Sequence, residues 1–231
     1  MRPPTSALAD RIVACRRCPR LIAHCRQVAR VKRRAYRDET YWGEPVPPFG
    51  PKSPRLLVVG LAPGAHGANR TGRLFTGDSS GDWLYRALFA HGFANRAESV
   101  RANDGLRLQD TVVTCAVRCA PPANRPSAAE ADACRPFLVE ELAGYRALRV
   151  VVALGRFAFD AVVRALPLSG RGTWPGRPVF GHGTVTLTED AKIALIASYH
   201  PSRQNTQTGR LTRPMFDRPF ARAKELLEEP R

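Results

Sequence analysis

The stretch Arg55-Leu56-Leu57-Val58-Val59-Gly60-Leu61-Ala62-Pro63-Gly64 decides the fold. Its apolar run is short and ends at a glycine, which is typical of a strand buried on both faces. Similar runs occur at 111–117, 149–155 and 193–198, and helical patterns occupy 5–35, 83–91, 127–145, 156–166 and 212–229. Strands that alternate with helices in this way predict an α/β fold, a three-layer α/β/α sandwich around a four-stranded parallel sheet.

The chain length fits one domain. With 231 residues the chain can bury a full core, and no repeat or low-complexity stretch divides it. Residues 36–54 hold five prolines, so this segment is predicted to be an extended arm, and residues 168–190 are predicted to be turns. We therefore expect a single domain over 1–231, in which 1–54 form an N-terminal helix and a proline-rich arm.

The charge of the chain points to a polyanionic partner. Lysine and arginine number 36 against 20 acidic residues, which gives a net charge of +16, and only four of the basic residues are lysines. Arginine makes planar, bidentate contacts with phosphate. The codon bias of a GC-rich genome would explain arginine in place of lysine, but it would not explain the shortage of acids. Nucleic acid is therefore the favoured partner.

The apolar pattern gives no sign of a membrane protein. No apolar stretch approaches the ~18 residues of a membrane span, and the first residues lack the apolar core of a secretory signal. We expect a cytoplasmic monomer that is associated with the nucleoid and has no membrane partner.

Six cysteines in a reducing compartment indicate metal binding rather than disulfides. Cys15 and Cys18 form a C-x2-C pair, whereas Cys119 and Cys134 are widely spaced. Four thiolates can hold zinc or an iron–sulfur cluster, and the wide second pair favours the larger cluster. The alternative is four unrelated core cysteines. The other two, Cys25 and Cys115, are expected to be buried thiols.

Unusual polar loops follow the predicted strands. In a parallel sheet the carboxyl ends of all strands meet at one edge, where ligands bind. The glycine-rich loop 61–80 matches neither of the common nucleotide-binding glycine motifs. It carries Phe75, which could stack on a base or anchor the loop, and Asp78, which could be a catalytic carboxylate or a helix N-cap. His200 follows the last strand and could donate a hydrogen bond to a developing anion.

Taken together, these motifs resemble a known family. They are Cys15-x-x-Cys18, Gly60-Leu61-Ala62-Pro63-Gly64-Ala65-His66-Gly67, Gly72-Arg73-x-Phe75-Thr76-Gly77-Asp78, Arg118-Cys119-Ala120-Pro121-Pro122, Cys134 and His200-Pro201-Ser202-Arg203-Gln204-Asn205-Thr206-Gln207-Thr208-Gly209-Arg210-Leu211. The chain is similar to the iron–sulfur uracil-DNA glycosylases of family 5, the type b enzymes. The resemblance implies a [4Fe–4S] cluster on Cys15, Cys18, Cys119 and Cys134. It also implies a base excision repair enzyme that hydrolyses the N-glycosidic bond of uracil in DNA and leaves an abasic site.

Two positions depart from the related family 4. That family carries Glu where this chain has Leu61, and Asn where it has Cys115. The missing amide could otherwise read the Watson–Crick edge of uracil. We therefore expect a broader substrate range that includes hypoxanthine and xanthine.

The chemistry of the cleaved bond assigns the expected roles. Cleavage builds positive charge on the sugar and negative charge on the base, so Asp78 is expected to face the sugar and His200 the base. The expected base pocket is Pro63, Gly64, Ala65, Phe75 and Asn124. The expected DNA contacts are Arg70, Arg73, Arg203, Gln204, Asn205, Arg210 and Leu211, where Leu211 or a neighbour fills the space of the flipped base.

The expected partner is double-stranded DNA that contains deaminated bases, and single-stranded DNA is left open. The cluster is expected to be architectural. The competing interpretation is a non-catalytic nucleic-acid-binding protein with a structural metal, which would leave Asp78 and His200 unexplained. A phosphohydrolase is disfavoured because no carboxylate cluster is available to hold Mg²⁺.

Overall fold

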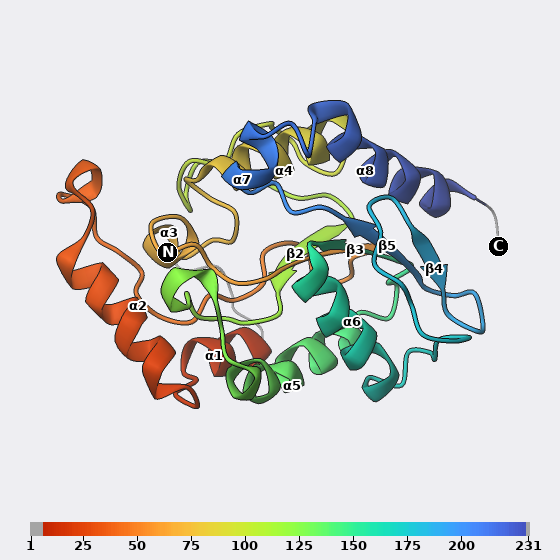
Figure 1. The fold of residues 1–231 in the computed structure, drawn as a ribbon, viewed down its shortest axis with the longest axis horizontal. Helices are drawn as coiled ribbons and strands as arrows, with labels where there is room; N and C mark the ends of the chain where they lie inside the picture. The colour runs from red at the N-terminus through yellow and green to blue at the C-terminus, as the bar shows by residue number, and fades with distance from the viewer. Residues whose placement is uncertain (1–6, 230–231) are drawn as a thin grey trace.

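The fold is built on one sheet, seen in the computed structural model, which describes residues 7–229 (Figure 1). The strands are β1 (Leu56–Gly60), β2 (Thr111–Cys115), β3 (Val150–Leu154), β4 (Val185–Leu187) and β5 (Ala194–Ser198), in the order β2-β1-β3-β5-β4. The four predicted strands are parallel, with Leu56 paired to both Thr111 and Val150. Their carboxyl ends therefore share one edge, as predicted.

The sheet has five strands rather than the predicted four. The additional strand, β4, pairs antiparallel with β5 inside the segment predicted to be turns. Val185 and Leu187 are 40% and 43% exposed, whereas every residue of the four parallel strands is buried. A three-residue edge strand of this kind has no continuous apolar run by which it could be recognised.

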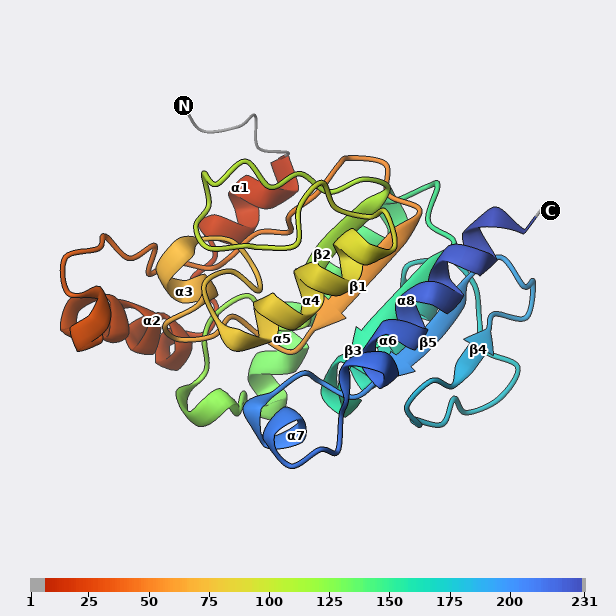
Figure 2. The same cartoon turned by 90° about the horizontal axis from the view of Figure 1, so that it is seen from above.

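Helices cover both faces of the sheet, which gives the three layers (Figures 1 and 2). One face carries α4 (Ser79–Ala90) and α8 (Arg213–Glu228), and the other carries α5 (Ala128–Gly144) and α6 (Arg156–Leu168). Alternate residues of β1 point into the two cores, Leu56 and Val58 into one, Leu57 and Val59 into the other. Burial on both faces explains why the strands are apolar throughout.

One helix boundary follows its local sequence signal, and another differs from its prediction. Ser127 and Glu130 form the predicted capping box at the start of α5. Helix α6 continues past its predicted end and includes Pro167. Proline cannot donate to the carbonyl of Val163, four residues earlier, and the indole Nε1 of Trp174 donates to that carbonyl instead, at 3.0 Å.

The N-terminal region departs from the predicted single helix over 5–35, of which residues 5 and 6 lie outside the described part. It forms α1 (Ala7–Val13) and α2 (Pro19–Val31), separated by the segment of Cys15 and Cys18. A short 3-10 turn, η1 (Arg34–Tyr36), follows, and the arm then packs against β2 through a bridge between Phe49 and Val113. Within residues 7–229 no helix is both long and apolar enough to cross a membrane.

Candidate active site

The site lies at the carboxyl edge of the sheet, where the loops after β1 and β5 meet. Phe75 packs against the end of β1, since a Cβ on Gly60 would lie 2.7 Å from its ring. The same ring is 6.0 Å from the imidazole of His200, with the two planes tilted by 34°. Phe75 adopts a φ of +52°, which a residue other than glycine rarely adopts. The structure thus places two predicted site residues, Phe75 and His200, next to each other.

Asp78 is both the N-cap of α4 and a wall of the glycine loop. One carboxylate oxygen accepts a hydrogen bond from the backbone N–H of Gly81 at 2.9 Å. The other oxygen lies against Gly64 and Gly67, where a Cβ on Gly67 would collide with the carboxylate. Burial raises the pKa of Asp78, and backbone N–H groups of Gly81 and Ser80 partly oppose that rise. In one conformation, the side chain of Asp78 therefore both caps α4 and places a carboxylate oxygen against the glycine loop.

His200 is fixed at the end of β5 through its backbone. Its carbonyl accepts a hydrogen bond from the amide of Asn205 at 2.8 Å, and the next carbonyl, of Pro201, accepts one from Ser80 at 3.0 Å. A Cβ on Gly155 would approach the His200 side chain to 3.2 Å, so the turn after β3 also packs against it. Burial lowers the pKa of His200 to about 4. The imidazole is therefore neutral at pH 7 and can donate one hydrogen bond.

The other predicted pocket residues are distributed around this centre. Pro63 is buried beneath the loop, and Gly64 and Ala65 are partly exposed. Asn124 is exposed in the short turn η2 (Pro122–Asn124), with a φ of +56°. Its role in the base pocket stays a prediction.

Two of the predicted DNA contacts, Arg70 and Arg73, have internal partners for their guanidinium groups. Arg70, in the short helix α3 (Ala68–Thr71), is 7% exposed and pairs with Glu39. Arg73 is 4% exposed and pairs with Asp104 at 2.6 Å, with a further hydrogen bond to Ser99. Both arginines hold the glycine loop to neighbouring segments in this structure, and their contact with DNA stays a prediction.

The predicted minor-groove segment is only partly exposed. Arg203 and Gln204, in α7 (Arg203–Gln207), and Arg210 are exposed, and their contact with DNA stays a prediction. Asn205 is partly buried and serves the backbone of His200, as described above. Leu211 is 1% exposed and belongs to the core beneath α8, so it anchors this segment and does not project as a wedge.

The four predicted metal ligands line one small cavity. Cys15 and Cys18 come from the break between α1 and α2, while Cys119 and Cys134 come from the segment after β2 and from α5. The backbone N–H of Arg118 donates to the Cys134 thiol at 3.3 Å. Within the described part of the chain, no three His, Cys, Asp or Glu side chains are grouped closely enough to hold a metal ion as they stand. Four thiols on one cavity nonetheless match the donor set of a Cys₄ iron–sulfur site.

The remaining cysteines are buried, as predicted. Cys25 and Cys115 are both fully buried. The Cys25 thiol exchanges hydrogen bonds with the backbone of Ala120, and the Cys115 thiol donates to the carbonyl of Val117 at 3.2 Å. Burial raises the pKa of Cys115 to about 12.

The sequence of the chain also matches the model of a known protein family. The model of the Uracil DNA glycosylase superfamily matches residues 47–224, which include the whole sheet and both edge loops. The chain belongs to the uracil-DNA glycosylase superfamily.

Relatives within this superfamily cover most of the chain. A type-5 uracil-DNA glycosylase of Mycobacterium tuberculosis is 52% identical over 219 residues, 93% of this chain and 79% of the relative. One of Thermus thermophilus is 47% identical over 220 residues, 95% of this chain and 97% of the relative. A type-4 uracil-DNA glycosylase of Pyrobaculum aerophilum is 30% identical over 158 residues, 68% of this chain and 71% of the relative. The similarity to the type-5 proteins is thus higher and longer.

One residue that supports the candidate active site was missed by the sequence analysis. His182 accepts a hydrogen bond from the backbone N–H of Tyr199 at its Nδ1, at 3.0 Å, so its proton resides on Nε2, which donates to the carbonyl of Met215 at 3.1 Å. Its ring stacks on Tyr199 at 4.9 Å, and Arg210 lies 5.0 Å over the same tyrosine. His182 therefore orders the chain on both sides of His200. A lone histidine in a turn-rich segment carries no sequence signal of this role.

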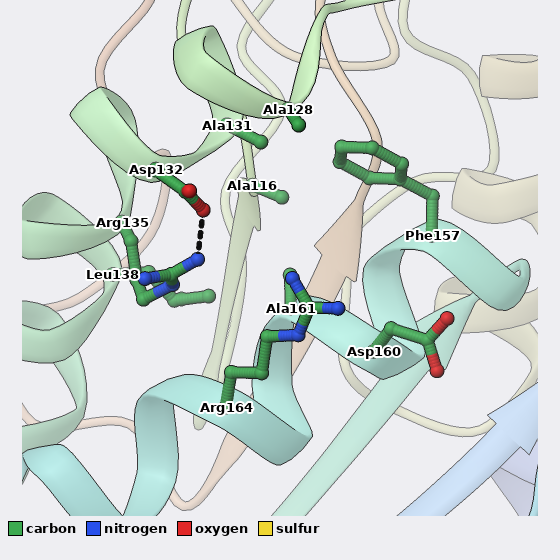
Figure 3. A pocket seen from close by; sticks show the side chains of 10 residues that line it. All are labelled: Ala116, Ala128, Ala131, Asp132, Arg135, Leu138, Phe157, Asp160, Ala161 and Arg164. Atoms are coloured by element: carbon green, nitrogen blue, oxygen red, sulfur yellow. Dashed lines mark hydrogen bonds and ion pairs between the residues drawn. The ribbon is translucent and has the colours of Figure 1, made fainter.

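A second cavity lies between α5 and α6 (Figure 3). Its walls are mostly apolar, with Ala131 and Ala161 on facing helices and Phe157 at one end. Arg135 pairs with Asp132 at its rim. Its lining contains none of the predicted catalytic or base-contacting residues, so it is not part of the candidate active site.

Proposed function

We propose that the protein is a monofunctional DNA glycosylase that hydrolyses the N-glycosidic bond of uracil in DNA and leaves an abasic site. One observation carries the proposal. The ring of Phe75 lies next to the neutral imidazole of His200, and Phe75 belongs to the same loop as the buried carboxylate of Asp78. A flipped base on that ring would have the donor of His200 within reach and the carboxylate of Asp78 toward its sugar. We further propose that the protein acts as a cytoplasmic monomer in base excision repair, on double-stranded DNA.

The reaction divides between these two residues. The bond from the sugar carbon C1′ to the base breaks, a water oxygen bonds to C1′, and the water protons end on the new hydroxyl and on the departing base. Asp78 stabilises the positive charge that develops on the sugar, and the N-cap bond to Gly81 holds its carboxylate in place. His200 is neutral at pH 7, so it donates a hydrogen bond to the base oxygen as negative charge develops there.

Two positions support the proposal that several deaminated bases are accepted. Leu61 is partly exposed at the start of the glycine loop and offers no carboxylate. Cys115 is buried beneath the edge, and its thiol donates to the carbonyl of Val117. A cysteine at this position supplies no side-chain amide to a base. Fewer fixed polar groups around the base impose less discrimination between bases. We therefore extend the proposed substrates to hypoxanthine and xanthine.

The four cysteines around one cavity support a [4Fe–4S] cluster. Such a cluster would bind the thiolates of Cys15, Cys18, Cys119 and Cys134 and supply a covalent tie between distant segments. It would hold the break between α1 and α2 to the loop after β2. No step of the proposed reaction requires electron transfer, so the proposed role is architectural.

The test is excision from defined duplexes. Oligonucleotides that carry uracil, hypoxanthine or xanthine at one position are incubated with the protein, and abasic sites are revealed by alkaline cleavage on a gel. We expect cleavage at the modified position. Tight DNA binding without any abasic product would contradict the proposal and favour the non-catalytic DNA-binding alternative.

A further inference from the structure

The end of α2 and the turn after it carry positive charge that the rest of the described chain does not neutralise. Arg30, Arg33, Arg34 and Arg37, here called the α2 arginine cluster, are all exposed. Within residues 7–229 none of the four forms an ion pair. One basic residue would suffice to stabilise the carboxyl end of the helix. Four unpaired arginines repel one another, so they indicate an anionic partner.

Three other arginines, in α2 and in the break before it, differ in this respect. Arg16 and Arg26 both pair with Glu44, and Arg20 pairs with Glu130. These ion pairs hold α2 and the break before it to the arm and to α5. Charge near the start of the helix is thus used within the protein, whereas charge at its end faces solvent.

The α2 arginine cluster lies beside the glycine loop. The ring of Tyr36 lies 4.0 Å beneath the guanidinium of Arg70, which fixes η1 against α3. The hydroxyl of Tyr41 accepts a hydrogen bond from the backbone N–H of Arg33 at 3.4 Å and shares one with Nδ1 of His66 at 3.0 Å. His66 belongs to the same loop that contacts the proposed catalytic carboxylate. Two sets of contacts therefore place the cluster next to the site.

Exposed arginines also lie on the opposite flank. Arg203, Arg210 and Arg213 extend from α7 to the start of α8, and the guanidinium of Arg213 lies 4.4 Å over Trp83. In Figures 1 and 2, α3 lies between the segment that follows α2 and α7. The glycine loop is therefore flanked by basic surfaces from the two ends of the chain.

We propose that the α2 arginine cluster binds phosphates of the DNA that flanks the target nucleotide, on the side opposite to α7. The inference rests on the proposed function in that its ligand is DNA. Arginine contacts to phosphate fix the position of a duplex without reading its sequence. The cluster would hold the DNA on one flank and the segment of Arg203 and Arg210 on the other, so the target nucleotide lies over the loop.

The test compares two triple variants with equal loss of charge. The first is R30Q/R33Q/R34Q. The control is K52Q/R107Q/R146Q, three exposed residues that precede β1, β2 and β3 and therefore lie toward the opposite edge of the sheet. Binding to an undamaged duplex of about thirty base pairs is measured over a range of salt concentrations, because each phosphate contact contributes about −0.9 to the slope of log K against log salt.

We expect the slope of the first variant to be shallower by about 2 to 3, while the control keeps the wild-type slope. The kcat/KM for a long uracil duplex, divided by that for a single strand of about six nucleotides, should fall at least about tenfold in the first variant only. Equal slopes for the two variants, or a DNA affinity unchanged by the first, would overturn the inference. Because the slope is measured without excision, a wild-type protein that binds DNA but releases no base contradicts the proposed function alone.

Discussion

Replacing Asp78 with asparagine separates its two roles. Asparagine caps a helix as well as aspartate does, so the hydrogen bond from Gly81 and the start of α4 are retained. Only the negative charge is lost. At about 4 Å and an effective dielectric constant of about 20, a carboxylate stabilises a unit positive charge by about 4 kcal/mol, against about 1 kcal/mol in water. The difference of about 3 kcal/mol corresponds to a loss of about 10² in rate.

The assay is single-turnover excision of uracil, with duplex binding measured in parallel. We expect Asp78→Asn to lower the excision rate at least about 10²-fold and to leave binding unchanged, because the lost interaction exists in the transition state. Wild-type activity in this variant would refute the catalytic role and leave Asp78 as a cap only.

The same substitution has a predicted effect on stability and on pH dependence. Burial raises the pKa of Asp78. A raised folded-state pKa means that the contribution of this group to stability is complete below the ordinary pKa and is lost as pH rises through the raised value. Asp78→Asn should therefore have a Tm at neutral pH no lower than wild type. Wild-type kcat/KM should fall as pH falls through the raised pKa, and the variant should lack that limb. A lower Tm would show that the activity was lost through misfolding.

Three further predictions concern the base, the core and the cluster. His200→Ala should slow single-turnover excision by about 10²–10³, and by less for a base that leaves readily as an anion; equal losses for all bases would contradict its role as donor. Arg73→Ala should cost about 3–5 kcal/mol in urea unfolding, because it leaves the buried carboxylate of Asp104 unpaired. The pKa of Asp104 lies well below its ordinary value, so this stabilisation is present above the ordinary pKa and should fade in wild type as pH falls below it. Anaerobically purified protein should absorb broadly near ~400 nm; Cys119→Ser should lose that band and Cys25→Ser should keep it, whereas colourless protein with one zinc would contradict the cluster.

The sequence predicted the strands whose residues are all buried. Strands buried on both faces produce apolar runs, so β1, β2, β3 and β5 could be located within one or two residues. The edge strand β4 was missed because Val185 and Leu187 are exposed, and exposed edge strands have no such run. The break between α1 and α2 was also missed, because helical periodicity on both sides of it hides a short interruption.

The structure brings together the predicted site residues whose position depends on chain order, but it gives internal partners to residues that the sequence left unpaired. Asp78 and His200 follow strands, so topology alone brings their loops to one edge. Arg70 and Arg73 were assigned to DNA because the sequence does not show that Glu39 and Asp104, each 31 residues away, neutralise them. The same lack of tertiary information hid the burial of Leu211 beneath α8.

The cap at Asp78 makes the placement of the proposed catalytic carboxylate depend on local folding. The carboxylate that faces the glycine loop is held by the amide of Gly81, a bond that exists only while the first turn of α4 is formed. When that turn opens, the carboxylate loses its support at the same moment that Ser80 releases the carbonyl after His200. One local opening event would therefore release both of the proposed catalytic groups. A chain in which this turn is unfolded would keep its exposed arginines but lose the placement of both proposed catalytic groups.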